Sequence, residues 1–402
     1  MAANERKERG IRRVDLAYAE VASSELARDV NRDVILEIVR SRQPVSRADL
    51  SRLSGLQPST VSAIAEELLR DKWIAEGGTA TRPRGRRPMM LSLNPELVML
   101  VADVRPMQAI LAVVDLNGRF LAREVLPLAT GAEKALQAMV DRMQEMRARQ
   151  SSHTFVGVGI SLPGRVDPAT QQLVHAPNLK WTGFDIKGFV QKQTGLPVEI
   201  DNAANACLLS ELWFGRMDGI RDAALVTFAE GVGASILSNG HLIAGRGGLA
   251  GEFGHIPIEP EGLPCACGFK GCWETIASTR AALRYFAEAA PDQPKITYTE
   301  LLHRAAEGQP AAVQAISEQA RGIGRGLRFI TASLSPEAIV IDGDIVSAWN
   351  IAGPIIEKAA QQSVLSGVAP RVIPSTDGEL GRLRGAAAVL LQRRSGTNKP
   401  ED

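Results

Sequence analysis

Residues 248–275 read GLAGEFGHIPIEPEGLPCACGFKGCWET, and this stretch organises the whole chain. It holds three of the four cysteines, Cys265, Cys267 and Cys272, within eight residues, and His255 lies ten residues before the first of them. One imidazole and three thiolates form a closed four-ligand set that favours a structural zinc ion. A disulfide with a spare thiol is disfavoured because the chain shows no secretory signal. A zinc-sensing role is disfavoured because closed sites usually serve structure.

The same stretch carries a family resemblance. The run GEFGH at 251–255, the three-cysteine loop and the WE pair at 273–274 together resemble the signature of the ROK family, which covers repressors, open reading frames and sugar kinases. The resemblance extends over nearly the whole chain. It implies an α/β protein in which an N-terminal winged helix-turn-helix precedes a two-lobed, actin-like ATPase body of the sugar kinase and RNase H-like type.

The resemblance also implies a sugar site between the two lobes. The positions that match the sugar-binding residues of the family are Asn178, Asn202, Glu252, His255 and Glu274. Carboxylates and an imidazole suit a polyol because they can bind pairs of adjacent hydroxyls. Two alternatives stay open. Asn178 could simply cap a turn, without touching a sugar. The two glutamates could support the zinc site by contacts with the residues that bind the metal.

The parts needed for phosphoryl transfer are degraded relative to the kinases of this family. Ala203 stands where those kinases carry the aspartate that takes the proton from the sugar hydroxyl. Residues 103–108, DVRPMQ, lack the glycines of the first phosphate turn, and Pro106 has no N–H. Glu230 lies in a second phosphate loop, and IVIDGD at 339–344 replaces the glycine pair that receives the adenosine. We therefore expect no enzyme. The runner-up is an ATP-dependent sugar kinase with a DNA-binding arm.

The first ninety-odd residues predict a helix-turn-helix. Helices are expected from Ser24, from Ser46 to Ser54 with a capping box, and from Pro58, with a glycine between the last two. The residues expected to face inward are Val30, Val34, Ile35, Ile38, Val39, Leu50, Leu53, Val61, Ile64, Leu68 and Leu69. After Trp73-Ile74, a Gly77-Gly78 turn is expected to lead into the arginine cluster, and residues 89–93 to return as a strand. Two strands around this basic loop would form a wing.

Two groups of residues are expected to face DNA. They are Gln57, Ser59, Thr60 and Ser62 on the second helix of the motif, and Arg82, Arg84, Arg86 and Arg87 in the wing. Small polar side chains can approach base edges, and clustered arginines neutralise phosphates. Residues 1–94 hold 17 Lys plus Arg against 13 Asp plus Glu, a net charge of +4 in a chain of net charge +1. The alternatives are a solvated basic loop or a basic helical docking module.

Composition and length agree with a protein of several domains. The chain has 402 residues, 45% hydrophobic and 23% charged, with no apolar run of the roughly 18 residues that span a bilayer. We expect a cytoplasmic protein without membrane contact. The expected domains are a tail at 1–22, a winged helix-turn-helix at 23–94, a first lobe at 95–220 closed by a helix at 380–394, a second lobe with the zinc motif at 221–379, and a tail at 395–402.

These features predict a sugar-responsive transcriptional regulator, a repressor of carbohydrate-use genes that contains structural zinc. Its partners would be double-stranded operator DNA and a sugar or sugar-phosphate effector, and the chain would form a homodimer or homotetramer on a palindromic site. Regulation by a partner protein instead of a small ligand is a further alternative. The sequence does not name the sugar.

Overall fold

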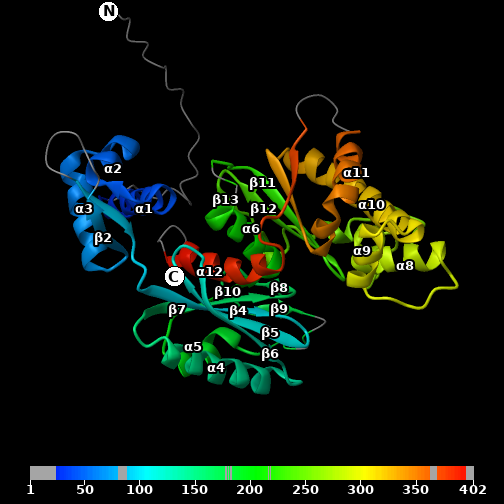
Figure 1. Ribbon diagram of the computed structural model, residues 1–402, viewed down its shortest axis with the longest axis horizontal. Coiled ribbons are helices and arrows are strands. Elements are labelled where there is room, and N and C mark those ends of the chain that lie inside the picture. The colour runs from blue at the N-terminus through cyan, green and yellow to red at the C-terminus, as the bar shows by residue number, and fades with distance from the viewer. Residues whose placement is uncertain are drawn as a thin grey trace, which may run out of the picture. The chain divides into compact units, whose positions relative to one another are not determined.

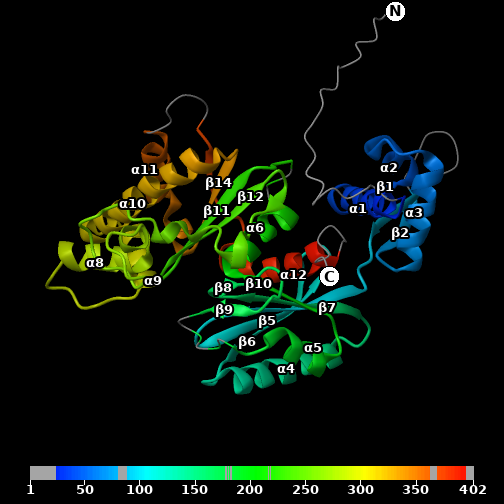
Figure 2. The ribbon, with the colours of Figure 1, turned by 180° about the vertical axis from the view of Figure 1, so that it is seen from behind.

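The structure, a computed structural model, describes residues 24–79, 88–176, 179, 181, 183–215, 217, 219–362 and 369–394. The chain divides into two compact units, Met1–Leu93 and Asn94–Asp402. Figures 1 and 2 show the elements of both units from opposite sides. In the described part of the chain, no helix combines the length and apolar character needed to cross a bilayer.

In its described residues, the first unit contains three helices and a three-stranded sheet of order β1-β3-β2. Its elements are α1 (Ser24–Arg42), β1 (Val45–Ser46), α2 (Arg47–Ser54), α3 (Pro58–Arg70), β2 (Ile74–Thr79) and β3 (Met89–Leu93). The predicted capping box is confirmed, because Ser46 Oγ accepts the N–H of Asp49 while the Asp49 carboxylate accepts the N–H of Ser46. Gly55 ends α2 in the left-handed conformation, and Pro58 opens α3. The helix-turn-helix order expected from the sequence is therefore present.

The apolar faces of this unit differ in part from the prediction. Ile35, Val39 and Leu50 are fully buried, as expected. Leu53, expected to face inward, is 51% exposed, and Val30 and Val34 also lie on the surface. Leu50 and Leu53 lie only about 60° apart around the helix axis, but Leu50 alone of this short helix is buried.

The second unit begins with a five-stranded sheet, which we call lobe one together with its helices. The elements are β4 (Leu97–Val104), β5 (Gln108–Asp115), β6 (Phe120–Pro127), α4 (Ala132–Arg149), β7 (Thr154–Leu162), β8 (Arg165–Val166), β9 (Leu173–His175), α5 (Ile186–Thr194), β10 (Val198–Asn202) and α6 (Ala203–Phe214). The sheet order is β10-β7-β4-β5-β6. Strands β4, β7 and β10 run parallel, and β5 and β6 form antiparallel pairs. Asp115 Oδ1 accepts the N–H groups of Asn117 and Arg119, which closes the hairpin turn between β5 and β6.

Lobe two repeats this sheet with the order β13-β12-β11-β14-β15. Its elements are β11 (Ala223–Phe228), β12 (Val232–Ser238), β13 (His241–Leu242), η1 (Arg246–Gly248), η2 (Glu252–His255), α7 (Glu274–Ala277), α8 (Thr279–Ala289), α9 (Tyr298–Ala306), α10 (Pro310–Leu334), β14 (Ala338–Asp342), η3 (Asp344–Ala348), α11 (Trp349–Gln361), β15 (Arg371–Pro374) and η4 (Gly378–Leu380). Each lobe thus combines a three-stranded antiparallel meander with two further parallel strands. Two sheets with the same order are the architecture that the resemblance implied.

Helices α6 and α12 (Gly381–Arg394) pack directly on each other, and α12 covers one face of the lobe-one sheet opposite α4 and α5 (Figure 1). Two glycines permit this close packing. A Cβ on Gly385 would collide with the carbonyl of Ala206, and a Cβ on Gly159 of β7 would collide with that of Ala386. Helix α6 also packs on β11 and β12, so one helix contacts both lobes.

Candidate metal centre and ligand site

The structure brings the four predicted zinc ligands together. The ligand atoms of His255, Cys265, Cys267 and Cys272 all lie within 4.8 Å of one another. His255 Nδ1 is 3.6 Å from Cys265 Sγ, and Cys267 Sγ is 3.5 Å from Cys272 Sγ. A zinc ion about 2.3 Å from each sulfur would place tetrahedral ligands about 3.8 Å apart, so the donor set fits this ion. All four cysteines are free thiols.

The three thiols of this cluster differ in how readily they ionise. Burial raises the pKa of the Cys272 thiol to about 12 and raises the pKa of Cys265. Burial acts in the same direction on Cys267, but a hydrogen bond from the backbone of Phe269 and the neighbouring thiols lower its pKa overall. The three thiols therefore do not ionise together by themselves. A bound divalent cation would hold all of them as thiolates.

Backbone hydrogen bonds hold the loop that carries Cys265, Cys267 and Cys272. The N–H of Cys265 donates to the carbonyl of Phe269, and the N–H of Trp273 donates to that of Ile256. Trp273 is 1% exposed, and its indole N–H donates to the carbonyl of Gly322 on α10. A Cβ on Gly326 would overlap the same indole, so α10 approaches the loop only because it has glycine there.

The two predicted hydroxyl-binding glutamates lie in different environments. Glu252 is half exposed, and its Oε2 is 3.8 Å from His255 Nε2, the nitrogen that does not face the cysteines. Glu274 is 9% exposed and engaged through both oxygens. Its Oε2 accepts the N–H of Val232 at 3.2 Å, and its Oε1 accepts from Arg280 Nη2 at 2.9 Å.

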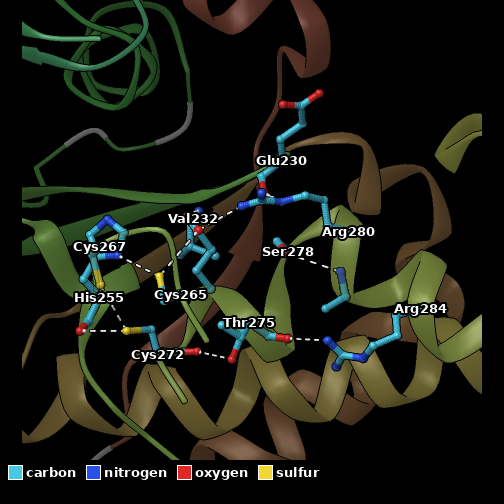
Figure 3. A network of polar contacts seen from close by, with 12 residues as sticks. Glu230, Val232, His255, Cys265, Cys267, Cys272, Thr275, Ser278, Arg280 and Arg284 are labelled. Atoms are coloured by element: carbon cyan, nitrogen blue, oxygen red, sulfur yellow. Dashed lines mark hydrogen bonds and ion pairs between the residues drawn. The ribbon is translucent and has the colours of Figure 1, made fainter. Parts of the chain in front are cut away.

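Arg280 joins the segment from His255 to Glu274, which we call the metal loop, to the turn between β11 and β12. Its Nε donates to the carbonyl of Glu230 at 2.7 Å, while its Nη2 binds Glu274 (Figure 3). Glu230, at the position of a family phosphate loop, has an exposed side chain. The N–H of Val232 in this loop is already bound by Glu274. The sequence did not point to Arg280, because its partners become neighbours only when α8 packs beside the loop.

Asn202 is the last residue of β10 and the N-cap of α6. Its Oδ1 accepts the N–H of Asn205, which caps the helix, and Ala203 is the first helical residue. Asn205 Nδ2 donates to Asp201 Oδ1 at 2.8 Å, and Ser235 Oγ of β12 donates to Asn205 Oδ1 at 2.6 Å. A buried hydrogen-bonded chain thus connects the end of β10 to lobe two. Sequence reasoning missed Asn205 and Ser235, although the second asparagine of the DNAANA run was the available signal.

The first phosphate turn is also occupied by the chain itself. Asp103 is 1% exposed, and its Oδ2 accepts from Arg105 Nε at 2.8 Å. The N–H of Arg105 is bound to the carbonyl of Gln108, and Pro106 has none. At the other predicted loop, Asp342 Oδ2 lies 3.6 Å from the thiol of Cys207, and burial raises the pKa of both groups.

The predicted DNA-facing residues are described only on α3. Gln57 and Ser59 are exposed, and Thr60 and Ser62 are half buried at the start of this helix. Ser62 Oγ donates to the carbonyl of Pro58. The wing arginines Arg82, Arg84, Arg86 and Arg87 lie outside the described residues, as does Asn178 of the predicted sugar site.

Comparison with known proteins identifies relatives of two kinds. The chain is 28% identical over 385 residues to the xylose repressor of Bacillus spizizenii, covering 93% of this chain and 98% of that protein. It matches the crystal structure of a ROK family transcriptional regulator, a homologue of the E. coli MLC protein, with a TM-score of 0.80 and 26% identity over 92% of this chain and 97% of that one. It also matches a Streptomyces griseus ROK family glucokinase, solved with glucose and AMPPNP, with a TM-score of 0.65 and 30% identity.

The extents of these matches confirm the resemblance read from the sequence. The glucokinase match covers 99% of that enzyme but 73% of this chain, so about a quarter of this chain has no counterpart in the enzyme. The family model itself matches residues 106–393, which is well over half of the sequence. The protein belongs to the ROK family.

Proposed function

We propose that this protein is a sugar-responsive, DNA-binding transcriptional regulator, a repressor of carbohydrate-use genes. One observation carries the proposal: the similarity to the xylose repressor and to the solved regulator extends over more than nine-tenths of this chain, whereas the glucokinase match covers 73% of it. The part without an enzyme counterpart is large enough to hold the helix-turn-helix unit.

The proposed DNA contact uses the start of α3. The second helix of a helix-turn-helix enters the major groove with its N-terminal residues first, which would place Gln57, Ser59, Thr60 and Ser62 at base edges. The wing arginines Arg82, Arg84, Arg86 and Arg87 would contact phosphates or the minor groove. One such unit makes few contacts. We therefore propose a homodimer or homotetramer that reads a palindromic operator.

The proposed metal is a structural zinc ion held by His255, Cys265, Cys267 and Cys272. Such an ion stabilises a loop that has little core of its own. Binding through His255 Nδ1 would leave Nε2 turned toward Glu252, so metal and effector sites would share one residue.

The proposed effector is a sugar or sugar phosphate bound by Asn178, Asn202, Glu252, His255 and Glu274. These residues come from both lobes, so binding would favour one lobe arrangement over another. A preference of about 1–3 kcal/mol would suffice to change operator affinity through the paired N-terminal units.

Phosphoryl transfer is not favoured by the site. Ala203 offers no base, and the Asp201 carboxylate accepts from the N–H of Asn202 and from Asn205 Nδ2. We expect no ATP-dependent phosphorylation of pentoses or hexoses by the purified protein. Turnover of a sugar with ATP would overturn this part of the proposal.

The Glu252→Ala variant tests the effector site. It should keep its zinc and its operator affinity but lose the response to the effector sugar by about tenfold or more, because a carboxylate that binds hydroxyls contributes about 1.5–3 kcal/mol. Operator binding measured by fluorescence anisotropy at increasing sugar concentration gives the result. Glu261→Ala removes an exposed glutamate from the same loop and is the matched control. A silent Glu252→Ala would instead favour regulation by a partner protein.

A further inference from the structure

Arg165 lies where lobe one meets the loop that leads to Glu252. It opens β8, directly after the Pro163-Gly164 turn at the end of β7. Gly164 has a φ of 97°, and a Cβ there would collide with the carbonyl of His175 on β9. The turn is thus packed tightly on the β8–β9 hairpin, which restricts where the Arg165 side chain can reach.

The side chain of Arg165 touches lobe two. A Cβ built on Gly248 would lie 3.3 Å from Arg165 Cγ and would collide with the carbonyl of Val166. Gly248 has a φ of 72° and stands four residues before Glu252. Arg165 therefore belongs to a direct contact between the lobes, next to the loop of the proposed effector site.

Within the described residues, the Nε–H group of Arg165 lacks an acceptor. Arg165 Nε is buried, and in the described part of the chain it has no hydrogen-bond partner and the guanidinium forms no ion pair. The nearest carboxylate along the chain is Asp167, whose Oδ1 accepts from Ala169 and Thr170. His175 stands opposite Arg165 in the β8–β9 ladder, and Arg246 lies two residues before Gly248. The charged groups near the contact are thus His175, Arg246 and a carboxylate, Asp167, that is already hydrogen-bonded within its own turn.

A buried N–H donor without an acceptor is unfavourable, and a ligand that supplies an anionic oxygen would relieve the penalty. A guanidinium suits phosphate because its N–H groups form a planar fork that matches two oxygens. The carboxylates of Glu252 on η2 and Glu274 on α7 would repel such an anion, so they suit the hydroxyls.

We propose that Arg165 binds the phosphate group of a phosphorylated sugar, and that this residue makes the regulator prefer sugar phosphates over the corresponding neutral sugars. The inference rests on the proposed function and names the chemical class of its effector. The sugar would lie with its hydroxyls toward Glu252 and His255 and its phosphate toward the contact between β8 and Gly248.

The test compares neutral and phosphorylated partners of the same sugars. Glucose and glucose 6-phosphate, N-acetylglucosamine and its 6-phosphate, and ribose and its 5-phosphate are titrated by calorimetry into the wild-type protein and into Arg165→Gln. The wild type should bind at least one phosphate ester about tenfold to a hundredfold more tightly than its neutral partner. Arg165→Gln should remove this preference and leave the neutral sugar unchanged, and Arg165→Lys should restore part of it because the charge returns without the fork.

Arg123→Gln is the matched control, since Arg123 is an exposed arginine of the same lobe on β6. Unchanged zinc content and unfolding temperature of Arg165→Gln exclude misfolding. The inference is wrong if the wild type binds neutral and phosphorylated sugars equally, or if Arg165→Gln keeps the preference for the phosphate. The proposed function would still stand in either case, provided that a sugar changes the operator affinity. If operator affinity responds to neither class of sugar, both are wrong.

Discussion

The Cys272→Ser variant is expected to lose its zinc and its response to sugar. Cys272 is fully buried, and its Sγ lies 3.5 Å from that of Cys267. A serine hydroxyl does not ionise near neutral pH, so the ligand set falls from four to three. The free energy of unfolding should drop by on the order of 3–5 kcal/mol, less than the roughly 10–16 kcal/mol of zinc-finger peptides, because the surrounding core persists.

The loss of sugar response has a separate physical reason. The metal loop carries His255 at one end and leads into Glu274 at the other, and Glu274 connects through Arg280 to the carbonyl of Glu230. When the loop relaxes, these side chains lose their fixed positions. Operator affinity without sugar should change little.

Elemental analysis of the purified variant measures the zinc directly, and anisotropy measures the response. Cys207→Ser is the matched control, because Cys207 is the one cysteine outside the metal set and is 2% exposed on α6. Its serine can still donate to Asp342, so zinc should remain at about one ion per chain. Full zinc occupancy in Cys272→Ser would refute the assigned ligand set.

The Ser59→Glu variant is expected to lose operator binding by about a hundredfold or more, since an unpaired charge buried in an interface costs about 2–5 kcal/mol. Ser59 is exposed in the first turn of α3, where the new carboxylate would face bases and phosphates. Acidic residues stabilise the N-terminal turn of a helix, so the variant should remain folded.

The readouts separate DNA contact from effector binding. Ser59→Glu should bind the sugar and zinc like the wild type. Ser41→Glu, which places the same charge on an exposed serine of α1, controls for the change in net charge. Wild-type operator affinity in Ser59→Glu would show that α3 does not enter the groove.

Local signals in the sequence predicted the helix starts of the first unit and the clustering of one histidine with three cysteines. Ser46 with Asp49 marked the start of α2, and Pro58 marked the start of α3. The spacing of the histidine and the cysteines sufficed to predict that these side chains lie together, because residues close in sequence need only a tight turn to meet.

Long-range packing explains what the sequence did not predict. Helix α10 begins at Pro310 and continues through Gly322 and Gly326. Glycines weaken a helical pattern, yet Gly322 and Gly326 serve close contacts with Ile276 and Trp273. The pairing of Glu274 with Arg280 depends equally on how α8 packs against the metal loop, which no local pattern records.

The most direct test is operator binding with DNA from the region upstream of the protein's own gene. Fluorescence anisotropy would follow this binding in the presence of pentoses, hexoses, amino sugars and their phosphates. We predict specific binding whose affinity shifts with at least one member of the panel at micromolar to millimolar concentration. Absence of specific DNA binding, or binding that no sugar or sugar phosphate changes, would contradict a sugar-responsive regulator.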